Sequence, residues 1–280
     1  MASLPNGMLI IAHNGVGWYP YIIQEDGGEW TKIGEIENPT HLTWNRLSEN
    51  IYIKGNDTKY YVYKIKSKEL THLPMFDDGS YTQMRAHNDG VVLIELENGK
   101  SSNTKIQSYT HNESKLENLV RQASSQFHPY IYNNKIFYAH VSCRLDCDPI
   151  IQEVWLKNLT TEKAKQLTLL NATSYLHSID LEGRYGFISS NTYGYYHIAR
   201  LELSTGKLNW LTAGQVTDSY PSVSKNGNLY FVRRLPSGIN LMKISHKILS
   251  NKKLELPIDE TKTIALPEDI QKIRYLEISN

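Results

Sequence analysis

Histidine side chains in predicted loops are the most chemically versatile residues of this chain. When its short repeated segments are aligned on their turns, His128, His177 and Pro221 take one equivalent position, and His41 lies near that position in an earlier segment. Imidazole rings gathered in this way can bind a metal, an anionic ligand or a peptide carboxylate. Because a loop histidine also commonly hydrogen-bonds its neighbour, and the geometry of a shared metal does not follow from the spacing, we predict binding residues here but no metal site.

Carboxylates gather in loops of the same kind. They are Asp77, Asp78, Asp146, Asp148 and Asp218. A pair held at a fixed separation can hydrolyse a glycosidic bond, but aspartate is also an ordinary turn residue. The sequence contains no G-x-S-x-G, H-E-x-x-H, P-loop or dinucleotide-binding motif. We therefore predict a protein with no catalytic residues and no cofactor, and a glycan-active hydrolase or lyase is the alternative.

Aromatic residues suggest how such a protein would bind. The chain has 19 Tyr against 5 Phe and 5 Trp, and tyrosine combines an apolar ring with a polar tip, which suits half-exposed binding surfaces. The candidates in predicted loops and strand starts are Trp18, Tyr19, Tyr193, Tyr195 and Tyr220. Tyr19 and Tyr195 begin predicted strands and can instead pack between sheets. Trp18 and Tyr193 have neighbouring glycines and are therefore the better surface candidates.

The two cysteines, Cys143 and Cys147, lie in one short segment, CRLDC. This spacing lacks the ligands of a structural zinc site and differs from the C-x-x-C redox motif. Two cysteines so close together favour a disulfide that closes a small loop, which in turn favours an oxidising compartment. We predict a periplasmic or secreted protein whose signal peptide is absent from this sequence, with the cytoplasm as the alternative.

Composition excludes two classes of partner. The 280 residues carry 30 Lys and Arg against 29 Asp and Glu, a net charge of +1, whereas binding to nucleic-acid phosphates needs a basic excess. The longest early apolar run, Met8 to Ala12, is far shorter than the roughly 18 residues of a membrane helix. We predict a globular protein that neither binds nucleic acid nor spans a membrane.

Short alternating strands and turn residues recur through the whole chain, with almost no helical periodicity. The clearest unit, 220–257, reads as four strands with an Asn-Gly hairpin turn after the first. Equivalent turns recur at about 44 residues, the length of a four-stranded propeller blade, and the anchors are Gly7, Glu49, Asp89, Asn134, Gly183 and Gly227. The sequence predicts an all-β chain, a six-bladed β-propeller that occupies 1–280 as one domain.

The two ends of the chain predict how the propeller closes. Too few residues precede Gly7 for a full inner strand, whereas Ile270 to Ile278 alternate as a strand would. We predict that this C-terminal segment pairs into the first blade as its innermost strand, which leaves no sheet edge open.

The repeat resembles that of TolB-type propellers, which runs roughly P-x-[FW]-S-P-D-G-x-x-[IL]-x-[FY]. The best match comprises Pro221, Ser224, Asn226, Gly227, Leu229 and Phe231. Weaker matches begin at Pro129 and at Ser178, and the resemblance spans essentially the whole chain at the level of the fold. Nothing in the sequence corresponds to the separate N-terminal domain of TolB, so the parent's role at the cell envelope is not carried over.

Together these observations predict a non-enzymatic scaffold. In a propeller, the loops between blades and those between second and third strands share one face, and function usually lies there. We predict that this face recognises a protein or peptide partner through the aromatic and histidine residues named above. The alternative is a carbohydrate-binding or glycan-cleaving propeller that uses the same rings as sugar platforms.

Overall fold

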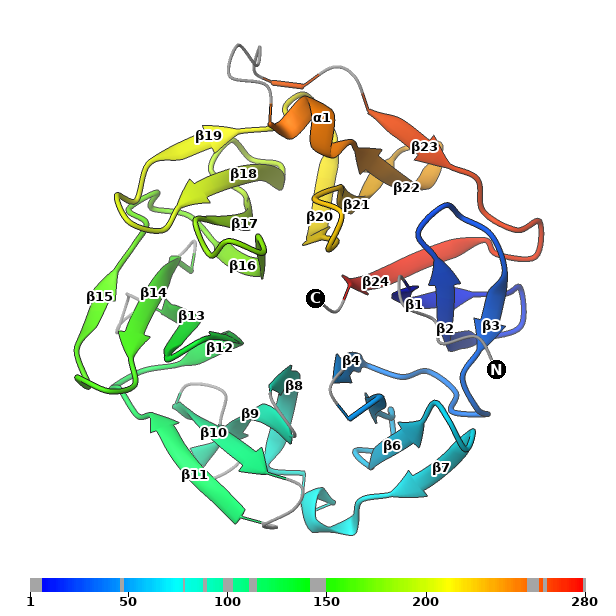
Figure 1. Ribbon diagram of the computed structural model, residues 1–280, viewed down its shortest axis with the longest axis horizontal. Coiled ribbons are helices and arrows are strands. Elements are labelled where there is room, and N and C mark those ends of the chain that lie inside the picture. The colour runs from blue at the N-terminus through cyan, green and yellow to red at the C-terminus, as the bar shows by residue number, and fades with distance from the viewer. Residues whose placement is uncertain are drawn as a thin grey trace. The chain divides into compact units, whose positions relative to one another are not determined.

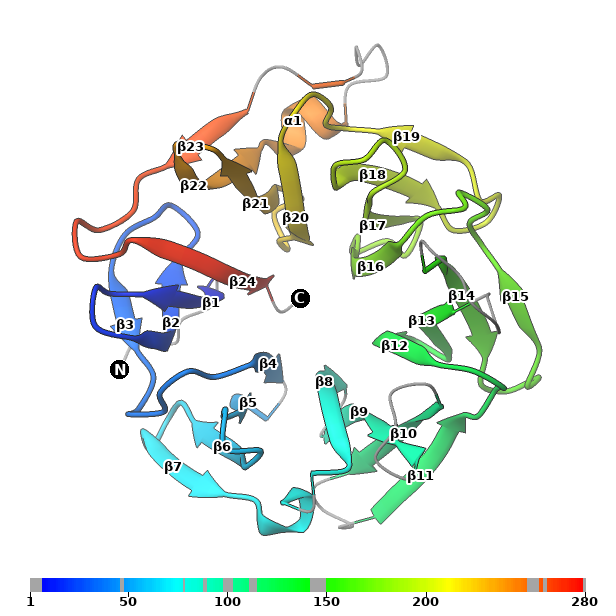
Figure 2. The same cartoon turned by 180° about the vertical axis from the view of Figure 1, so that it is seen from behind.

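The computed structural model describes residues 7–45, 48–77, 79–87, 90–97, 103–110, 115–141, 150–250, 257–258 and 261–278. These residues form six four-stranded sheets. In each sheet the strands are arranged side by side from an inner strand to an outer one (Figures 1 and 2). The predicted fold class is thereby confirmed: the chain is a six-bladed β-propeller.

By backbone contacts the chain divides into two compact units. Unit 1 comprises residues 1–42, 177–189 and 193–280, and unit 2 comprises residues 43–176 and 190–192. Each unit holds three blades or most of them. The prediction of a single domain over 1–280 stays a prediction.

Unit 1 contains the first, fifth and sixth blades along the chain. The first blade has the order β24 (Lys272–Ile278), β1 (Gly7–His13), β2 (Trp18–Gln24) and β3 (Trp30–Lys32). The fifth consists of β16 (Ser174–Ile179), β17 (Tyr185–Ser190), β18 (His197–Glu202) and β19 (Leu208–Trp210). The sixth consists of β20 (Thr217–Val223), β21 (Leu229–Leu235), β22 (Gly238–Ile244) and β23 (Lys262–Ile264), with the short helix α1 (His246–Leu249) after β22.

Unit 2 contains the second, third and fourth blades. The second consists of β4 (His41–Asn45), β5 (Asn50–Lys54), β6 (Tyr60–Lys64) and β7 (Glu69–His72), followed by the 3-10 turn η1 (Pro74–Phe76). The third consists of β8 (Tyr81–His87), β9 (Gly90–Leu96), β10 (Thr104–Thr110) and β11 (Lys115–Val120). The fourth consists of β12 (Gln126–Tyr132), β13 (Lys135–Val141), β14 (Gln152–Asn158) and β15 (Ala164–Gln166).

The turn residues that define the repeat adopt the backbone that tight hairpins require. Positive φ angles occur at the anchors Glu49, Gly183 and Gly227, one or two residues before the second strand of each blade, whereas in the fourth blade the positive φ lies at Asn133, one residue before the anchor Asn134. Glycine and asparagine tolerate this conformation better than other residues. Of the remaining anchors, Gly7 begins β1, and Asp89 lies outside the described residues.

The C-terminal strand closes the first blade, as predicted. β24 pairs antiparallel with β1 over Met8↔Ile278 to His13↔Lys272 and is the inner strand of that blade (Figure 1). The pairing gives β1 a hydrogen-bonded neighbour on each side, so neither of its edges is open to another chain.

The core of unit 1 is built from strands that are buried on both faces. Along β21, Tyr230 and Val232 pack with residues of the first blade, including Met8 and Ile10, whereas Leu229 and Phe231 pack with the fifth blade. Successive side chains of a strand point to opposite faces, so one apolar run supplies two cores. This explains why the second strands read as continuous hydrophobic segments instead of alternating ones.

Unit 2 repeats this arrangement. Val91 and Leu93 of β9 belong to a cluster with Tyr52 and Tyr60 of the second blade, whereas Val92 and Ile94 belong to one with the fourth blade. Tyr138, which is fully buried, donates its hydroxyl to Gln122 Oε1 at 2.9 Å, and burial raises the pKa of this hydroxyl. Many tyrosines of the chain are therefore core residues and not surface residues.

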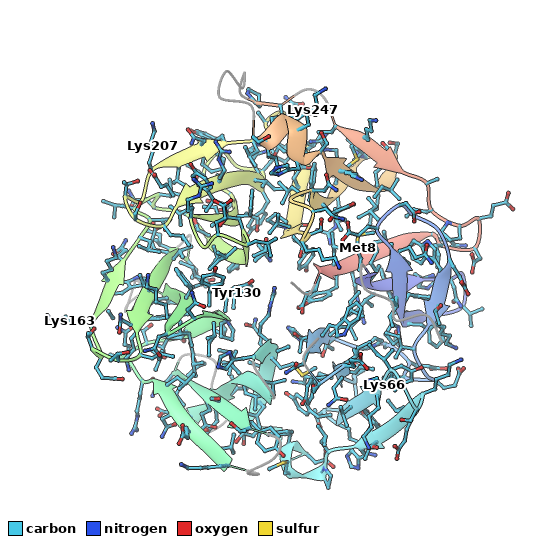
Figure 3. All side chains as sticks on the ribbon, in the orientation of Figure 1. Met8, Lys66, Tyr130, Lys163, Lys207 and Lys247 are labelled. Atoms are coloured by element: carbon cyan, nitrogen blue, oxygen red, sulfur yellow. The ribbon has the colours of Figure 1, made fainter. Side chains whose placement is uncertain are left out.

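Apart from β11, the outer strands span only three or four residues, as edge strands commonly do. All three residues of β15 are exposed, and Figure 3 labels Lys163 and Lys207 at the outer side of their own blades, whereas Tyr130 lies on an inner strand. Within the described part of the chain, no helix has the length and apolar character needed to cross a membrane.

Candidate functional site

The inner strands of unit 1 carry two irregularities that redirect side chains. In β20 the register with β21 shifts between Ser219 and Ser222, and Tyr220 has a φ of 57°. In β24 the register with β1 shifts at Arg274, which has no partner between Tyr275 and Ile273. A bulge bends a strand and re-aims the side chain of the extra residue, so Tyr220 and Arg274 leave the regular alternation of their strands.

Three aromatic rings, one from each inner strand of unit 1, contact one another. The His177 ring lies 5.6 Å from the Tyr220 ring, which lies 5.4 Å from the ring of Tyr275. His177 Nε2 is 2.8 Å from Ser189 Oγ, and the Tyr275 hydroxyl donates to Glu277 Oε2 at 2.8 Å. These hydrogen bonds fix the orientation of the rings at both ends of the row.

Arg274 connects this row to Trp18. Its guanidinium lies 4.7 Å from the Trp18 ring, a cation–π geometry, and it donates to the backbone carbonyl of Pro39. Burial lowers the pKa of Arg274, which the field of Tyr220 partly offsets. We call Trp18, His177, Tyr220, Arg274 and Tyr275 the inner-strand cluster.

A buried ion pair lies in the sixth blade, between the start of β20 and the end of β21. The Arg233 guanidinium donates to both oxygens of Asp218, at 2.8 and 2.9 Å, and Asp218 is completely buried. Such bidentate geometry is the strongest form of this pair, and the Asp218 bond raises the pKa of Arg233. Burial lowers the pKa of nearby His197, whose Nδ1 has no hydrogen-bond partner among the described residues.

Of the predicted aromatics, Trp18 and Tyr220 belong to the cluster and three others do not. Tyr193 is 65% exposed and packs edge-on against Trp210 at 5.2 Å, and Tyr195 is 45% exposed. Tyr19 is buried, with its hydroxyl 3.2 Å from Glu37 Oε1 and the Lys32 ammonium 3.9 Å from its ring centre. Tyr19 is thus engaged within its own blade.

The predicted histidines occupy different environments. His177 belongs to the cluster, and His41 begins β4. In unit 2, the His128 amide donates to Gln83 Oε1 at 2.7 Å and its ring lies 4.1 Å from that of Tyr175. The register shift after Phe127 makes His128 equivalent to Tyr220, and not to Pro221 as the turn alignment predicts. The two bulges are alike, but the hairpin after β12 closes over a shorter turn than the one after β20, so counting back from the turns misaligns the two strands.

Two of the five predicted aspartates lie in the described part of the chain, and both have a basic partner. Asp77 lies 2.8 Å from His72 Nε2, and Asp218 is held by Arg233. The other three aspartates and the predicted Cys143–Cys147 disulfide lie outside the described residues. Among the side chains that the structure describes, no group of three or more His, Cys, Asp or Glu could hold a metal ion.

Sequence reasoning missed Arg274 and Tyr275, which complete the cluster. The C-terminal segment predicts a strand, and the alternation of Ile273, Tyr275 and Glu277 would place all three on one face. The bulge at Arg274 changes this alternation, since it puts Ile273 in the core and leaves Tyr275 half-buried. Nothing in a single sequence signals such a bulge.

Comparison with known proteins identifies the fold and no more. No protein-family model matches the sequence, and neither does any curated protein. Among solved structures, TolB from Acinetobacter baumannii is similar with a TM-score of 0.75 and 13% identity, over 99% of this chain and 67% of that one. A nidogen/laminin complex structure is similar with a TM-score of 0.70 and 9% identity, over 98% of both chains.

A third similar structure is an oligogalacturonate lyase in complex with manganese, with a TM-score of 0.57 and 11% identity over 82% of this chain and 68% of that one. At such low identity these likenesses concern the path of the backbone and carry no residue roles. The chain therefore has the β-propeller fold that TolB also has.

Proposed function

We propose that this protein is a non-enzymatic scaffold whose inner-strand cluster binds a segment of a protein partner. The observation that carries the proposal is the contact of Trp18 with Arg274, next to the row of three rings. Tryptophan, tyrosine and arginine contribute most of the binding energy in protein interfaces. Here they are oriented by hydrogen bonds before any partner arrives, which lowers the entropic cost of binding.

The state of the nearby carboxylate supports binding over catalysis. A glycoside-cleaving site needs one carboxyl group that can donate a proton and another that stays ionised. Asp218 accepts both of its hydrogen bonds from Arg233 and has no exposed surface. A carboxylate that is completely buried, with both oxygens bonded to one guanidinium, serves the packing of the blade and is not placed to meet a substrate.

The experiment is quantitative capture from extracts of the source cells, with the wild-type protein and the variants Trp18→Ala and Arg274→Gln as baits. We expect one or more proteins to be retained by the wild type and reduced at least tenfold by either variant, since loss of an interface anchor typically costs about 2 kcal/mol or more. Leu169→Ala is the control, because Leu169 is 79% exposed and lies in unit 2. Equal capture by wild type and both variants would contradict the proposal.

The alternative function is recognition or cleavage of a carbohydrate, and the similarity to an oligogalacturonate lyase fold favours testing an acidic one. Aromatic rings can stack on sugars and Arg274 can pair with a uronate. Oligogalacturonates would be titrated against the protein and then incubated with it. Saturable binding that Trp18→Ala abolishes would replace the peptide proposal, and ultraviolet absorbance from an unsaturated product would make the protein a lyase.

We further propose that the protein works in an oxidising compartment, where Cys143 and Cys147 form a disulfide. The support is their spacing and the fold shared with TolB. Mass spectrometry after thiol alkylation, on protein purified from fractionated source cells, tests both statements together. Two alkylated cysteines in cytoplasmic material would refute this proposal and leave the binding proposal untouched.

A further inference from the structure

Arg274 carries a positive charge that no acidic side chain neutralises in the described part of the chain. Its guanidinium stacks near the Trp18 ring and donates to the Pro39 carbonyl, and it forms no ion pair among the described residues. Burial lowers the pKa of Arg274, and the opposing field comes from Tyr220 and not from a carboxylate. A partly buried charge without a counter-charge is costly to the folded protein, so a partner that supplies one binds more tightly.

One nitrogen of this guanidinium can be reached from outside the protein. Nε of Arg274 is buried, and Nη2 is bonded to Pro39. Nη1 has no hydrogen-bond partner among the described residues and, unlike Nε, keeps exposed surface. Arg274 as a whole is half-buried, as are Trp18 and Tyr220 beside it. The charge therefore lies where a carboxylate of another molecule can bond to it.

The carboxylates nearest to this contact along the chain have other partners. Glu37 accepts the hydroxyl of Tyr19 at 3.2 Å. Glu277 accepts the hydroxyl of Tyr275 at 2.8 Å and is buried. Neither of them therefore neutralises Arg274 from within the protein.

The sixth blade adds a second arginine without a counter-charge. Arg234, near the end of β21, donates Nη1 to Ser219 Oγ at 3.4 Å and forms no ion pair among the described residues. Ser219 directly precedes Tyr220, whose ring contacts that of Tyr275 in β24. Positive charge on both neighbouring blades favours the approach of an anionic segment over a cationic one.

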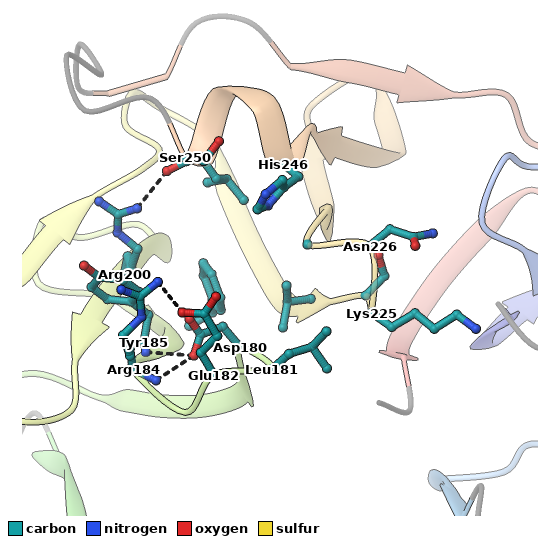
Figure 4. A pocket seen from close by; sticks show the side chains of 15 residues that line it. Asp180, Leu181, Glu182, Arg184, Tyr185, Arg200, Lys225, Asn226, His246 and Ser250 are labelled. Carbon is teal, nitrogen blue, oxygen red and sulfur yellow. Dashed lines mark hydrogen bonds and ion pairs between the residues drawn. The ribbon is translucent and has the colours of Figure 1, made fainter.

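A cavity between the fifth and sixth blades contains an arginine in the opposite situation. The cavity has a volume of about 260 Å³, and its walls come from the β16–β17 turn, the β20–β21 turn and α1 (Figure 4). On one side of it, Arg184 forms an ion pair with Glu182, and both side chains are 65% exposed. Arg184 thus has the carboxylate partner that Arg274 lacks, which makes it a suitable control.

We propose that the partner segment bound by the inner-strand cluster carries an aspartate or glutamate whose carboxylate accepts a hydrogen bond from Arg274 Nη1. This inference rests on the proposed function, because it names the chemistry of the partner that the cluster binds. The carboxylate supplies the missing counter-charge, and the rings of Trp18 and Tyr220 contact apolar parts of the same segment. A charge-assisted hydrogen bond of this kind is roughly twice as strong as a neutral one.

The first test is selection from a phage-displayed library of random peptides, with the full chain as bait. We expect the peptides selected by the wild type to contain more Asp and Glu than the unselected library. Arg274→Gln should abolish this excess, since glutamine can still donate to Pro39 but carries no charge, whereas Arg274→Lys keeps the charge and should keep the excess. Arg184→Gln is the control and should select the same peptides as the wild type, because its arginine is already paired.

The second test measures the pairing directly. A selected peptide is synthesised with its acidic residue intact and with that residue replaced by the corresponding amide, and both are titrated against two proteins. The replacement should weaken binding to the wild type about tenfold, and binding to Arg274→Gln less than about twofold, because only the wild type offers the charge. The acidic peptide alone should lose affinity for the wild type as salt is raised.

The outcomes distinguish this inference from the proposed function. Selected peptides without an acidic excess, or an equal effect of the amide replacement on both proteins, would overturn the acidic specificity and leave the binding proposal standing. Failure to select any peptide, or selected peptides that bind Trp18→Ala as tightly as the wild type, would overturn the binding proposal and this inference with it.

Discussion

The buried polar groups at the two ends of the β20–β21 hairpin differ in whether they have hydrogen-bond partners. At the open end, Arg233 donates two hydrogen bonds to the buried carboxylate of Asp218. At the turn end, Ser224 and the neighbouring Arg200 of β18 have donors without acceptors among the described residues. The difference teaches which groups the fold depends on: removing one partner of a satisfied buried pair leaves an uncompensated charge, whereas removing an unsatisfied donor leaves no group unpaired.

The largest expected effect is the loss of the satisfied pair. Asp218→Ala leaves the Arg233 guanidinium largely buried without a counter-charge, because its side chain is only 19% exposed. We expect the free energy of unfolding to fall by about 3–5 kcal/mol in urea titrations. Glu182→Ala is the control, since its ion pair with Arg184 is 65% exposed on both sides and its loss should be barely measurable. Similar losses in both variants would contradict the assignment.

A second comparison uses two buried serines of neighbouring blades. Ser178 Oγ donates to the Pro221 carbonyl at 3.0 Å and accepts the Val223 amide at 3.2 Å, so Ser178→Ala should cost about 1–3 kcal/mol of unfolding free energy. Ser224→Ala should cost nothing, because its hydroxyl has no partner among the described residues. Denaturation of both variants under one set of conditions measures the difference, and equal losses would show that Ser224 is satisfied.

A third prediction concerns the turn that frames the cavity. Gly227 has a φ of 74°, and a Cβ there would lie 2.2 Å from His246 Nδ1. Gly194 has a φ of 87° with nothing within 4 Å of the same position. Both alanine variants bear the backbone strain of about 1–2 kcal/mol, but Gly227→Ala should lose roughly 1 kcal/mol more through the His246 contact. The double variant with His246→Ala should recover that part, and thermal unfolding of the three proteins checks it.

The smallest expected effect is on the pH dependence of stability. Burial lowers the pKa of His197 in the folded protein, while Asp218 raises and Arg233 lowers it. On acidification, His197 therefore takes up its proton at a higher pH in the unfolded chain than in the folded protein. Stability is lost as the pH falls below about 6.5 towards the lower pKa of the folded protein. Unfolding midpoints in urea between neutral and mildly acidic pH should fall less steeply for His197→Gln than for the wild type. Identical slopes would contradict the shift.

The sequence predicts most of the fold because each blade repeats a local pattern. The turns at Gly183 and Gly227 need a positive φ, which few residues other than glycine adopt readily. Each apolar run in the sequence is long enough for only one strand. The closing strand follows from the same reasoning, since Ile273 and Leu276 need a buried place and β1 needs a second neighbour.

The site is predicted less well, and individual residues show why. Trp18 and Tyr193 look equivalent in sequence, yet Trp18 packs against Arg274 whereas Tyr193 contacts Trp210. Tyr19, adjacent to Trp18, is buried against Glu37 and Lys32. The sequence signals neither the bulge at Arg274 nor the lack of a partner for Ser224 among the described residues, because both depend on which side chains and backbone groups the neighbouring strands contribute.

By itself, the sequence determined the class of fold, the number of blades and the strand that closes the first one. These depend on turn chemistry and on the periodicity of apolar residues, which are local properties of the chain. Only the tertiary structure decided which polar groups are satisfied, because the partner of a buried donor depends on the register of paired strands and on what packs beside them. Asp218 finds Arg233 across one hairpin, and Ser224, six residues later, finds no acceptor among the described residues.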